Sequence, residues 1–484
     1  MGQHTGALRR ITRVRGAAPA ALLAATLAAC VAVPPPAPLQ PSQTSAEFSA
    51  RRLGALAQLP PASAGWDRSQ WLAAALQLNP QLAEGRAAVA AAAAAERTAA
   101  EHPNPNMELF AEYLTNAAQS AAWLYGLSLD FLLHQPGTRA RERERTQLET
   151  ALAQSDLADS IWQVRAALRQ ALLDAVSSQD EARLLDSLTV ERQALVEGDR
   201  RRVELGELDR AQLLTDQLEL ARARQRQQQS QARRNTAVAL LAAAVGVPAA
   251  ALNEVPLRWD SWAAIDTLPD SAPGRWRDQA LIGRPQIVRA LREYDLAELG
   301  LKNAAAQRWP QLHVTPAYAW GSGGAREDSL EDIAQESAVG VSFEPPLFNQ
   351  HQGPIGEAVA RRTAAGEHLK AVQADIFAQI DRAELAWPAA RAAWDGARQA
   401  ADISARQSVR AGQALAAGDG ERSDALTARI GATEAQLTVL EAAHTAQVAF
   451  GELEDAYRRP LEGAESRLAG SAAPQSPDTA GRRS

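Results

Sequence analysis

The most constraining feature of this 484-residue chain is an internal repeat that spans most of its length. Four landmarks recur in the same order, with offsets between 205 and 214 residues. The pairs are Asn79-Pro80 and Arg284-Pro285, Pro105 and Pro310, Gly126-Leu127-Ser128 and Gly340-Val341-Ser342, and Gly206-Glu207 and Gly418-Asp419. A nearly constant offset indicates a duplicated unit. We therefore expect two copies of one arrangement, residues 61–275 with a connector and residues 276–460.

Each copy contains two short segments in which apolar and polar residues alternate. They are residues 106–113 and 123–131 in the first copy, and residues 312–320 and 338–344 in the second. A period of two predicts strands. Strands of about ten residues with one apolar face and aromatic residues near their ends are typical of outer-membrane barrels. A soluble hairpin with one buried face is the alternative that alternation alone leaves open.

Long stretches with few helix breakers flank both predicted hairpins. Residues 138–197 and 207–244 contain neither Gly nor Pro, and residues 67–101 are rich in alanine. These stretches, together with residues 357–417 and 421–459, are predicted helices. Apolar residues three and four positions apart predict narrow coiled-coil seams in two of them. The seams are Ile161, Val164, Leu168, Leu172 and Ala175, and Ala211, Leu214, Leu218 and Ala221.

Gly206 and Gly418 each separate two of the long predicted helices. A helix–turn–helix at each glycine would fold the chain back on itself. Each copy is then a helix–hairpin–helix unit whose tip lies far from its strands. The fold class is mainly α with β.

The N-terminus resembles a bacterial lipoprotein signal. Arginines precede a short apolar run that ends in Leu27-Ala28-Ala29-Cys30, which resembles a lipobox. The resemblance implies a signal peptide at residues 1–29 and lipidation of Cys30, the only cysteine. Residues 30–60 are expected to form a lipid-anchored linker, extended through its proline-rich residues 31–50. An ordinary signal peptide with an incidental cysteine is the alternative. Residues 461–484 are expected to be disordered.

Composition excludes several classes of function. The net charge of −7 is mixed along the chain, and no basic block suggests nucleic-acid binding. No nucleotide-binding, serine-hydrolase or metalloprotease motif occurs, so we expect no enzyme activity and no cofactor. One cysteine and seven scattered histidines offer no metal-site motif.

Four strands cannot close a barrel on their own. An open sheet edge in lipid would leave backbone groups without hydrogen-bond partners. Several chains must therefore share one barrel, and two copies would leave little lumen because side chains fill small barrels. Three or more copies are therefore favoured, and barrel size leaves the number among these open.

The duplicated unit, the Asn79-Pro80 opening and the segment Pro346-Leu347-Phe348-Asn349-Gln350 resemble the TolC-type outer-membrane efflux proteins over residues 65–460. The resemblance implies a homotrimer with a twelve-strand transmembrane β-barrel, continued by a long periplasmic α-helical barrel. Its partners would be outer-membrane lipid, a periplasmic adaptor (membrane fusion protein) and an inner-membrane transporter of the resistance-nodulation-division type. The turn Pro346-Leu347-Phe348-Asn349 followed by Gln352-Gly353 also resembles the branch that exports heavy-metal cations, although drug-exporting branches share parts of it.

The resemblance also implies a gate at the periplasmic tip. Asp424 matches the first of two acidic positions that ring the closed mouth in the family, whereas the second is Thr427 here. Further acidic candidates near the tip turns are Asp419, Glu421, Glu207 and Asp209. The alternative is that these carboxylates are solvated charges or helix caps.

The expected function is therefore a passive exit duct for exported heavy-metal cations or small toxic compounds, lipid-anchored in the outer membrane and extending into the periplasm. A structural coiled-coil envelope lipoprotein without channel activity is the alternative. It accounts for Cys30 and the helices but not for four amphipathic strands.

Overall fold

A computed structural model describes residues 38–55, 65–114, 122–133, 136–271, 274–322, 335–343, 345 and 347–461. The chain divides into two units, residues 1–50 and 51–484. The described part of the first unit contains α2 (Pro41–Ser49). An extended conformation is expected over residues 31–50, and this prediction is wrong for residues 41–49. Pro41 occupies the first turn of α2, where its fixed φ favours a helix and its missing N–H costs nothing.

Several predicted features lie outside the described residues. They are the signal peptide at residues 1–29, the lipidation site Cys30 and the tail beyond Leu461.

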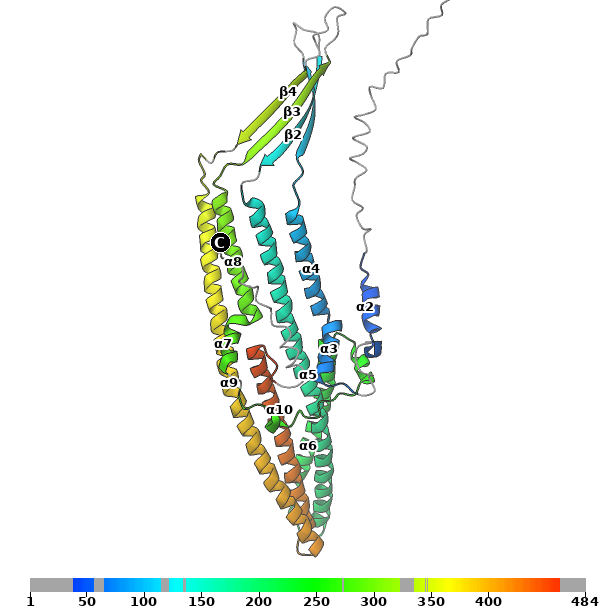
Figure 1. Ribbon diagram of the computed structural model, residues 1–484. Coiled ribbons are helices and arrows are strands. Elements are labelled where there is room, and N and C mark those ends of the chain that lie inside the picture. The colour runs from blue at the N-terminus through cyan, green and yellow to red at the C-terminus, as the bar shows by residue number, and fades with distance from the viewer. Residues whose placement is uncertain are drawn as a thin grey trace, which may run out of the picture. The chain divides into compact units, whose positions relative to one another are not determined.

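The second unit contains the same element order twice (Figure 1). The first half comprises α3 (Arg68–Leu78), α4 (Pro80–Ala100), β1 (Asn106–Leu114), β2 (Ala122–Leu133), α5 (Thr138–Glu204) and α6 (Arg210–Val245). The second comprises α7 (Gly274–Gly283), α8 (Pro285–Ala306), β3 (Leu312–Ser322), β4 (Gln335–Phe343), α9 (Gln352–Ala417) and α10 (Arg422–Tyr457). Short helices η1 (Leu53–Ala55), η3 (Ala249–Glu254) and η4 (Ile265–Thr267) lie before and between the halves.

The helices follow the sequence closely, with one correction. The single helix predicted over residues 67–101 is two helices, because Asn79 ends α3 and caps α4. The Asn79 side-chain oxygen accepts from Gln81 N and Leu82 N at 2.9 and 3.2 Å, and Pro80 takes the first helical position. By contrast, α9 continues through Pro388 for 66 residues.

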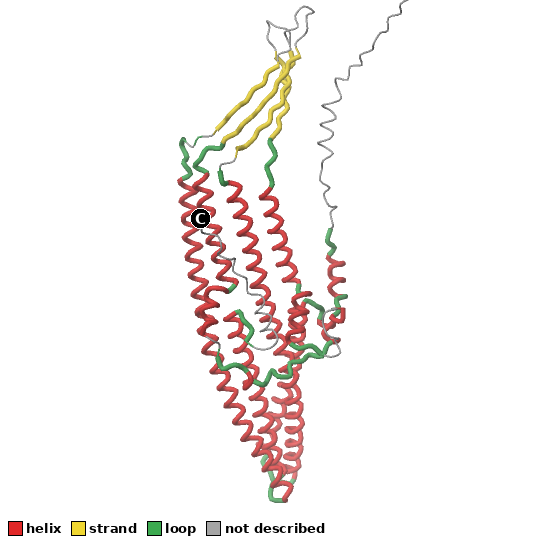
Figure 2. Tube along the Cα trace, in the orientation of Figure 1, coloured by secondary structure: helices red, strands yellow, loops and turns green. Residues whose placement is uncertain are grey.

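The four strands form one antiparallel sheet in the order β1-β2-β3-β4. The two hairpins join where β2 pairs with β3. In Figure 2 the strands continue beyond one end of the helices, and the α5–α6 and α9–α10 turns lie at the other end. Among the described helices, none has the length and apolar composition that a membrane-spanning helix requires.

The buried core lies among the helices, not the strands. Leu168 and Leu172 of α5, Trp71 of α3, and Phe450 of α10 lie within it, with at most 1 % of each side chain exposed. The seam predicted along α5 is therefore mostly buried within the chain. The seam predicted along α6 is not, because Leu214 and Leu218 are 65 % and 51 % exposed. A single chain leaves this second apolar stripe uncovered.

Candidate functional site

The sheet has one apolar face that crosses all four strands. Register places Leu109 opposite Leu127, Leu127 opposite Tyr318, and Val314 opposite Val341, so alternate positions fall on one side. This face carries Met107, Leu109, Ala111, Tyr113, Trp123, Tyr125, Leu127, Leu129, Phe131, Leu133, Leu312, Val314, Pro316, Tyr318, Trp320, Val339, Val341 and Phe343. Many of these side chains are exposed, including Leu109 and Val341. An exposed apolar surface of this extent calls for an apolar environment.

An aromatic cluster lies on the apolar face, toward the connections between paired strands. The ring centroids of Tyr113 and Trp123 are 4.9 Å apart, and those of Trp123 and Tyr125 are 6.2 Å apart. Trp320 continues the cluster, 6.2 Å from Tyr125 and 5.9 Å from Tyr318. The cluster therefore joins both hairpins. Tyr and Trp bands of this kind favour the boundary between lipid and water.

The opposite face of the sheet carries mainly polar and small side chains, apart from Phe110, Leu124 and Leu132. The polar and small side chains include Asn106, Glu108, Glu112, Ser128, Asp130, His313, Thr315, Ala317 and Ser342. His313 Nδ1 lies 3.1 Å from both carboxylate oxygens of Asp130, and Thr315 Oγ1 lies 3.4 Å from Asp130. These contacts tie β2 to β3 and leave a face suited to water.

Phe110 is the aromatic exception on the polar face. Its ring lies over Gly126 of the paired strand, where a Cβ would overlap it. The glycine therefore gives this ring its place on the sheet.

Gly206 and Gly418 occupy corresponding turns after the two longest helices. Both have left-handed backbone conformations, with φ of 74° and 83°. Glu207 N donates to Arg202 O at 2.8 Å, and Asp419 N donates to Ala414 O at 2.9 Å. These bonds satisfy carbonyls at each helix end, and a residue with a Cβ would be strained at either glycine.

The five acidic tip candidates differ in their contacts. Asp209 caps α6, since its side chain accepts from Ala211 N at 3.2 Å. Glu421 precedes α10 and pairs with Arg202 of α5 at 3.5 Å. Glu207, Asp419 and Asp424 are exposed, and none of these three forms an ion pair within the described part of the chain. The structure thus joins Glu421 to the first half and leaves Asp424 to solvent in the first turn of α10.

Two further residues near the tip turns are not among those that the sequence predicted. Arg202 joins the turns of both halves, because it pairs with Glu421 and its Nη1 donates to Ser423 Oγ at 3.4 Å. Asp199 of α5 is buried, and the carboxyl of Asp216 of α6 interacts with it. Burial and the neighbouring Asp216 carboxyl raise the pKa of Asp199 above its ordinary value. Only the nearness of these residues to Gly206 in sequence could have marked them.

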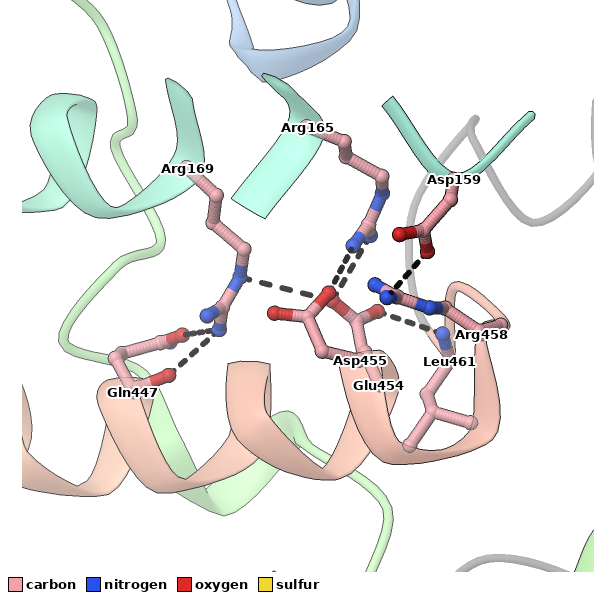
Figure 3. Close-up of polar contacts among 8 residues, drawn as sticks. All are labelled: Asp159, Arg165, Arg169, Gln447, Glu454, Asp455, Arg458 and Leu461. Carbon is pink, nitrogen blue, oxygen red and sulfur yellow. Dashed lines mark hydrogen bonds and ion pairs between the residues drawn. The ribbon is translucent and has the colours of Figure 1, made fainter. Parts of the chain in front are cut away.

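A buried charge cluster joins α5 to α10 (Figure 3). Arg165 Nη2 donates to Glu454 Oε2 at 2.9 Å, and Arg169 Nε lies 3.6 Å from the same oxygen. Arg169 Nη2 also donates to Gln447 O at 2.6 Å. Leu461 N donates to the other Glu454 oxygen at 2.6 Å. Gly451 makes room for this arrangement, because a Cβ there would overlap the Arg169 guanidinium.

The two carboxyls of the cluster titrate differently. Burial alone would raise the pKa of Glu454, but Arg165 and Arg169 outweigh it and hold that pKa below its ordinary value. Burial raises the pKa of the neighbouring Asp455 to about 6, against the opposing attraction of the same arginines. Glu454 is therefore the ionised centre of the cluster at neutral pH.

No group of three or more His, Cys, Asp or Glu side chains is arranged to hold a metal ion within the described ranges.

Comparison with known proteins places part of the sequence in a family. Residues 276–457 match the family described as outer membrane efflux protein. No match to the curated proteins was found.

Solved structures with similar folds cover most of the chain. The outer membrane protein VceC from Vibrio cholerae has a TM-score of 0.64 at 17 % identity, over 82 % of this chain and 97 % of that one. The CmeC outer membrane channel of Campylobacter jejuni has a TM-score of 0.64 at 14 % identity, over 91 % and 97 %. A membrane protein from Pseudomonas aeruginosa has a TM-score of 0.66 at 16 % identity, over 81 % and 93 %. At these identities the likeness shows the fold.

Proposed function

Since residues 276–457 match the outer membrane efflux protein family and the chain is a TolC-type outer-membrane efflux protein, we propose that three copies form the exit duct of a tripartite pump. The observation that carries the proposal is the two-faced sheet. One face is apolar across all four strands, and the other is mainly polar or small, with Phe110, Leu124 and Leu132 as exceptions. In a closed barrel the apolar face would contact lipid on the outside, and the other face would contact water in the lumen.

The sheet edges support an assembly. Within the described chain, β1 and β4 each pair on one side only. Such edges cannot lie in lipid, so β4 of one copy would pair with β1 of the next. Three copies close twelve strands, enough for a lumen. The duplication of the unit stays a prediction, supported by the shared element order of the two halves.

The exposed stripe on α6 supports the same assembly at the level of the helices. Leu214 and Leu218 would be covered by a neighbouring chain, in the manner of a coiled-coil seam. The helices would then form a barrel that crosses the periplasm. The tip turns at Gly206 and Gly418 would face a periplasmic adaptor and, beyond it, an inner-membrane transporter of the resistance-nodulation-division type.

The cargo is proposed to be heavy-metal cations or small toxic compounds. Leu347, Phe348 and Asn349, in the segment that resembles the metal-exporting branch, support the first class. The chain would conduct metal ions and not hold them, since its only methionines are Met1 and Met107. Growth of a deletion strain on graded metal salts and on drugs distinguishes the two classes.

Anchoring through lipidated Cys30 would add a second attachment to the outer membrane. Metabolic labelling with a palmitate analogue tests it. Label on the wild-type chain and none on Cys30→Ser is expected, and equal label on both would contradict it.

Asp424 is proposed to line the tip aperture. Three copies would bring three carboxylates together, attracting cations while repelling one another. Asp424→Ala should then raise single-channel conductance and weaken cation selectivity. Glu207→Ala removes the same charge from the other turn and shows whether the effect is specific to Asp424. Unchanged conductance and selectivity in Asp424→Ala would contradict the assignment.

The deciding experiment is planar-bilayer conductance of the detergent-solubilised protein, with its mass in detergent measured on the same sample. Discrete cation-selective channels from a trimer are expected. A soluble monomer without conductance would overturn the duct and leave the structural coiled-coil lipoprotein in its place.

A further inference from the structure

A cavity of about 820 Å³ lies where the strands meet the helices, on the apolar side of the sheet. Leu133, Leu312 and Phe343 form its floor, and register places all three side by side on β2, β3 and β4. Trp309, which follows α8, lies beside the floor. In Figure 1 these strand ends adjoin the ends of α5 and α8. The cavity is thus continuous with the apolar face already described.

The wall of the cavity carries two cations and no carboxylate. Lys302 of α8 and Arg141 of α5 both line it. Arg141 donates to the neutral oxygens of Asn303 and Thr138, at 2.7 and 3.1 Å. Lys302 is exposed and has no ion pair within the described ranges. The two positive charges therefore face the cavity without an acidic partner in its lining.

The nearest acidic residues in sequence are already paired. Glu298, one helical turn before Lys302, lies 3.2 Å from Arg362. Glu142, next to Arg141, lies 3.9 Å from Arg145. The cavity thus offers an apolar floor, an indole and a net positive wall.

We propose that this cavity binds an anionic phospholipid of the inner leaflet of the outer membrane. The proposal rests on the proposed function, which places the apolar face of the sheet in lipid and the helices in the periplasm. The lipid phosphate lies between Lys302 and Arg141, and the acyl chains lie on Leu133, Leu312 and Phe343. Basic pockets and an interfacial Trp at this depth suit an anionic head group.

In the proposed trimer, a neighbouring copy would leave most of the cavity open. Copies would join through β1 and β4, so Phe343 is the one floor residue on a joining strand, while Leu133 and Leu312 lie on β2 and β3. In the helical layer α8 packs between α5 and α9 of its own chain. The occupant is therefore a lipid and not a second chain.

The chain provides a sharp test, because Lys302 and Lys370 are its only lysines. Lys370 of α9 donates to Glu367 at 2.8 Å and serves as the internal control. The trimer is reconstituted into phosphatidylcholine vesicles with or without phosphatidylglycerol, treated with an amine-acylating reagent and analysed by mass spectrometry. We expect phosphatidylglycerol to slow acylation of Lys302 about fivefold, the effect of one cation on an anionic lipid. Acylation of Lys370 should not change.

Variants test the head-group contact directly. Lys302→Gln should lower the phosphatidylglycerol retained by the detergent-solubilised trimer about fivefold. Lys370→Gln removes the same charge outside the cavity and should retain it all. Equal losses in both variants would overturn the assignment to this cavity.

Further outcomes would overturn the proposal in different ways. Equal protection of Lys302 by phosphatidylcholine would show that the site does not require an anionic head group. Equal protection by free glycerol phosphate would replace the lipid with a small anion. Conductance recorded on the same vesicles separates this proposal from the proposed duct. Channels together with equal acylation of Lys302 in both kinds of vesicle would contradict the lipid site alone. An absence of channels would contradict the duct and, with it, the placement of the apolar face in lipid.

Discussion

Glu454 compensates the charges of two buried arginines, whose burial would otherwise cost folding free energy. It is fully buried and faces Arg165 and Arg169, both about 95 % buried. A buried ion pair adds little stability relative to apolar residues, yet removing one partner leaves an uncompensated charge. The cluster therefore sets which surface of α10 meets α5.

Glu454→Gln tests this description. It should lower the free energy of unfolding by about 3–5 kcal/mol at pH 7, because both arginines lose their carboxylate. Asp455→Asn is the matched control and should cost far less, since the raised pKa of Asp455 shows that its ionised form is poorly stabilised. Urea titration of the solubilised protein measures both. Equal losses would contradict the central place of Glu454.

Asp199 should make the helices near the tip sensitive to pH. Its pKa is raised in the folded chain, so its stabilising contribution is complete below the ordinary value of 3.8 and is lost as the pH rises through the folded value. Asp199→Asn should remove that part of the pH dependence and stabilise the α5–α6 contact at neutral pH. Urea midpoints across this pH range measure it. An unchanged pH profile in the variant would show that the Asp216 contact does not matter.

Single residues differ in how far the sequence predicts them. Gly206 and Gly418 could be placed in turns because a glycine between two long helices has few other uses. Glu454 could not be paired with Arg165, because 289 residues separate them and only the packing of α10 on α5 brings them together. Asp209 is a gate candidate on its charge, and the sequence alone did not show that its side chain also caps α6.

At the level of helices, periodicity predicted apolar seams but not what covers them. The stripe along α5 is buried by its own chain, whereas the stripe along α6 is exposed, although both have spacings of three and four. Hydrophobic spacing fixes a face of a helix and carries no information about which neighbour meets it. The split at Asn79 was likewise missed, because the alanines around it favour one continuous helix.

The α6 stripe gives a test of assembly. Leu218→Glu should shift the proposed trimer toward monomer while leaving the protomer folded, because it places a charge in the proposed contact between chains. Gln212→Glu adds the same charge on a different face of α6 and should leave the trimer intact. Mass in detergent and circular dichroism measure assembly and folding separately. A stable Leu218→Glu trimer would show that this stripe is not an interface.

Two glycines with similar backbones should differ in their tolerance of a side chain. Gly206 and Gly246 have φ of 74° and 88°, but a Cβ on Gly246 would meet the backbone of Leu78 and Asn79, whereas Gly206 faces open space. Gly206→Ala should cost about 1 kcal/mol from φ strain alone. Gly246→Ala should cost clearly more, because the end of α6 must move away from α3. Thermal midpoints of the two variants compare them, and equal losses would contradict the steric argument.

For the whole assembly, the two faces of the sheet predict opposite responses to one substitution. Val341→Arg should hinder membrane insertion, since a charge that faces lipid costs about 2–4 kcal/mol per chain at the middle of a bilayer and less toward its surfaces. Ser342→Arg, on the next residue and the other face, should insert normally and weaken cation selectivity. Membrane fractionation and bilayer recording measure these effects. Normal insertion of Val341→Arg would place that face away from lipid.

The joints between helices have a mechanical consequence. Helix α5 is continuous over 67 residues, or about 100 Å. Beside it, α6 and α4 follow one another end to end as two separate helices. These two helices are fastened where Asn79 Nδ2 donates to Ala244 O at 2.8 Å and Arg51 bridges Leu78 O and Gly246 O. The second half repeats this, since Arg284 at the start of α8 donates to Ala456 O at 3.1 Å near the end of α10. A continuous helix packed against two shorter helices is expected to bend where the two shorter helices meet. A torque applied at the tip turns would therefore bend the chain at this junction and move the strands little.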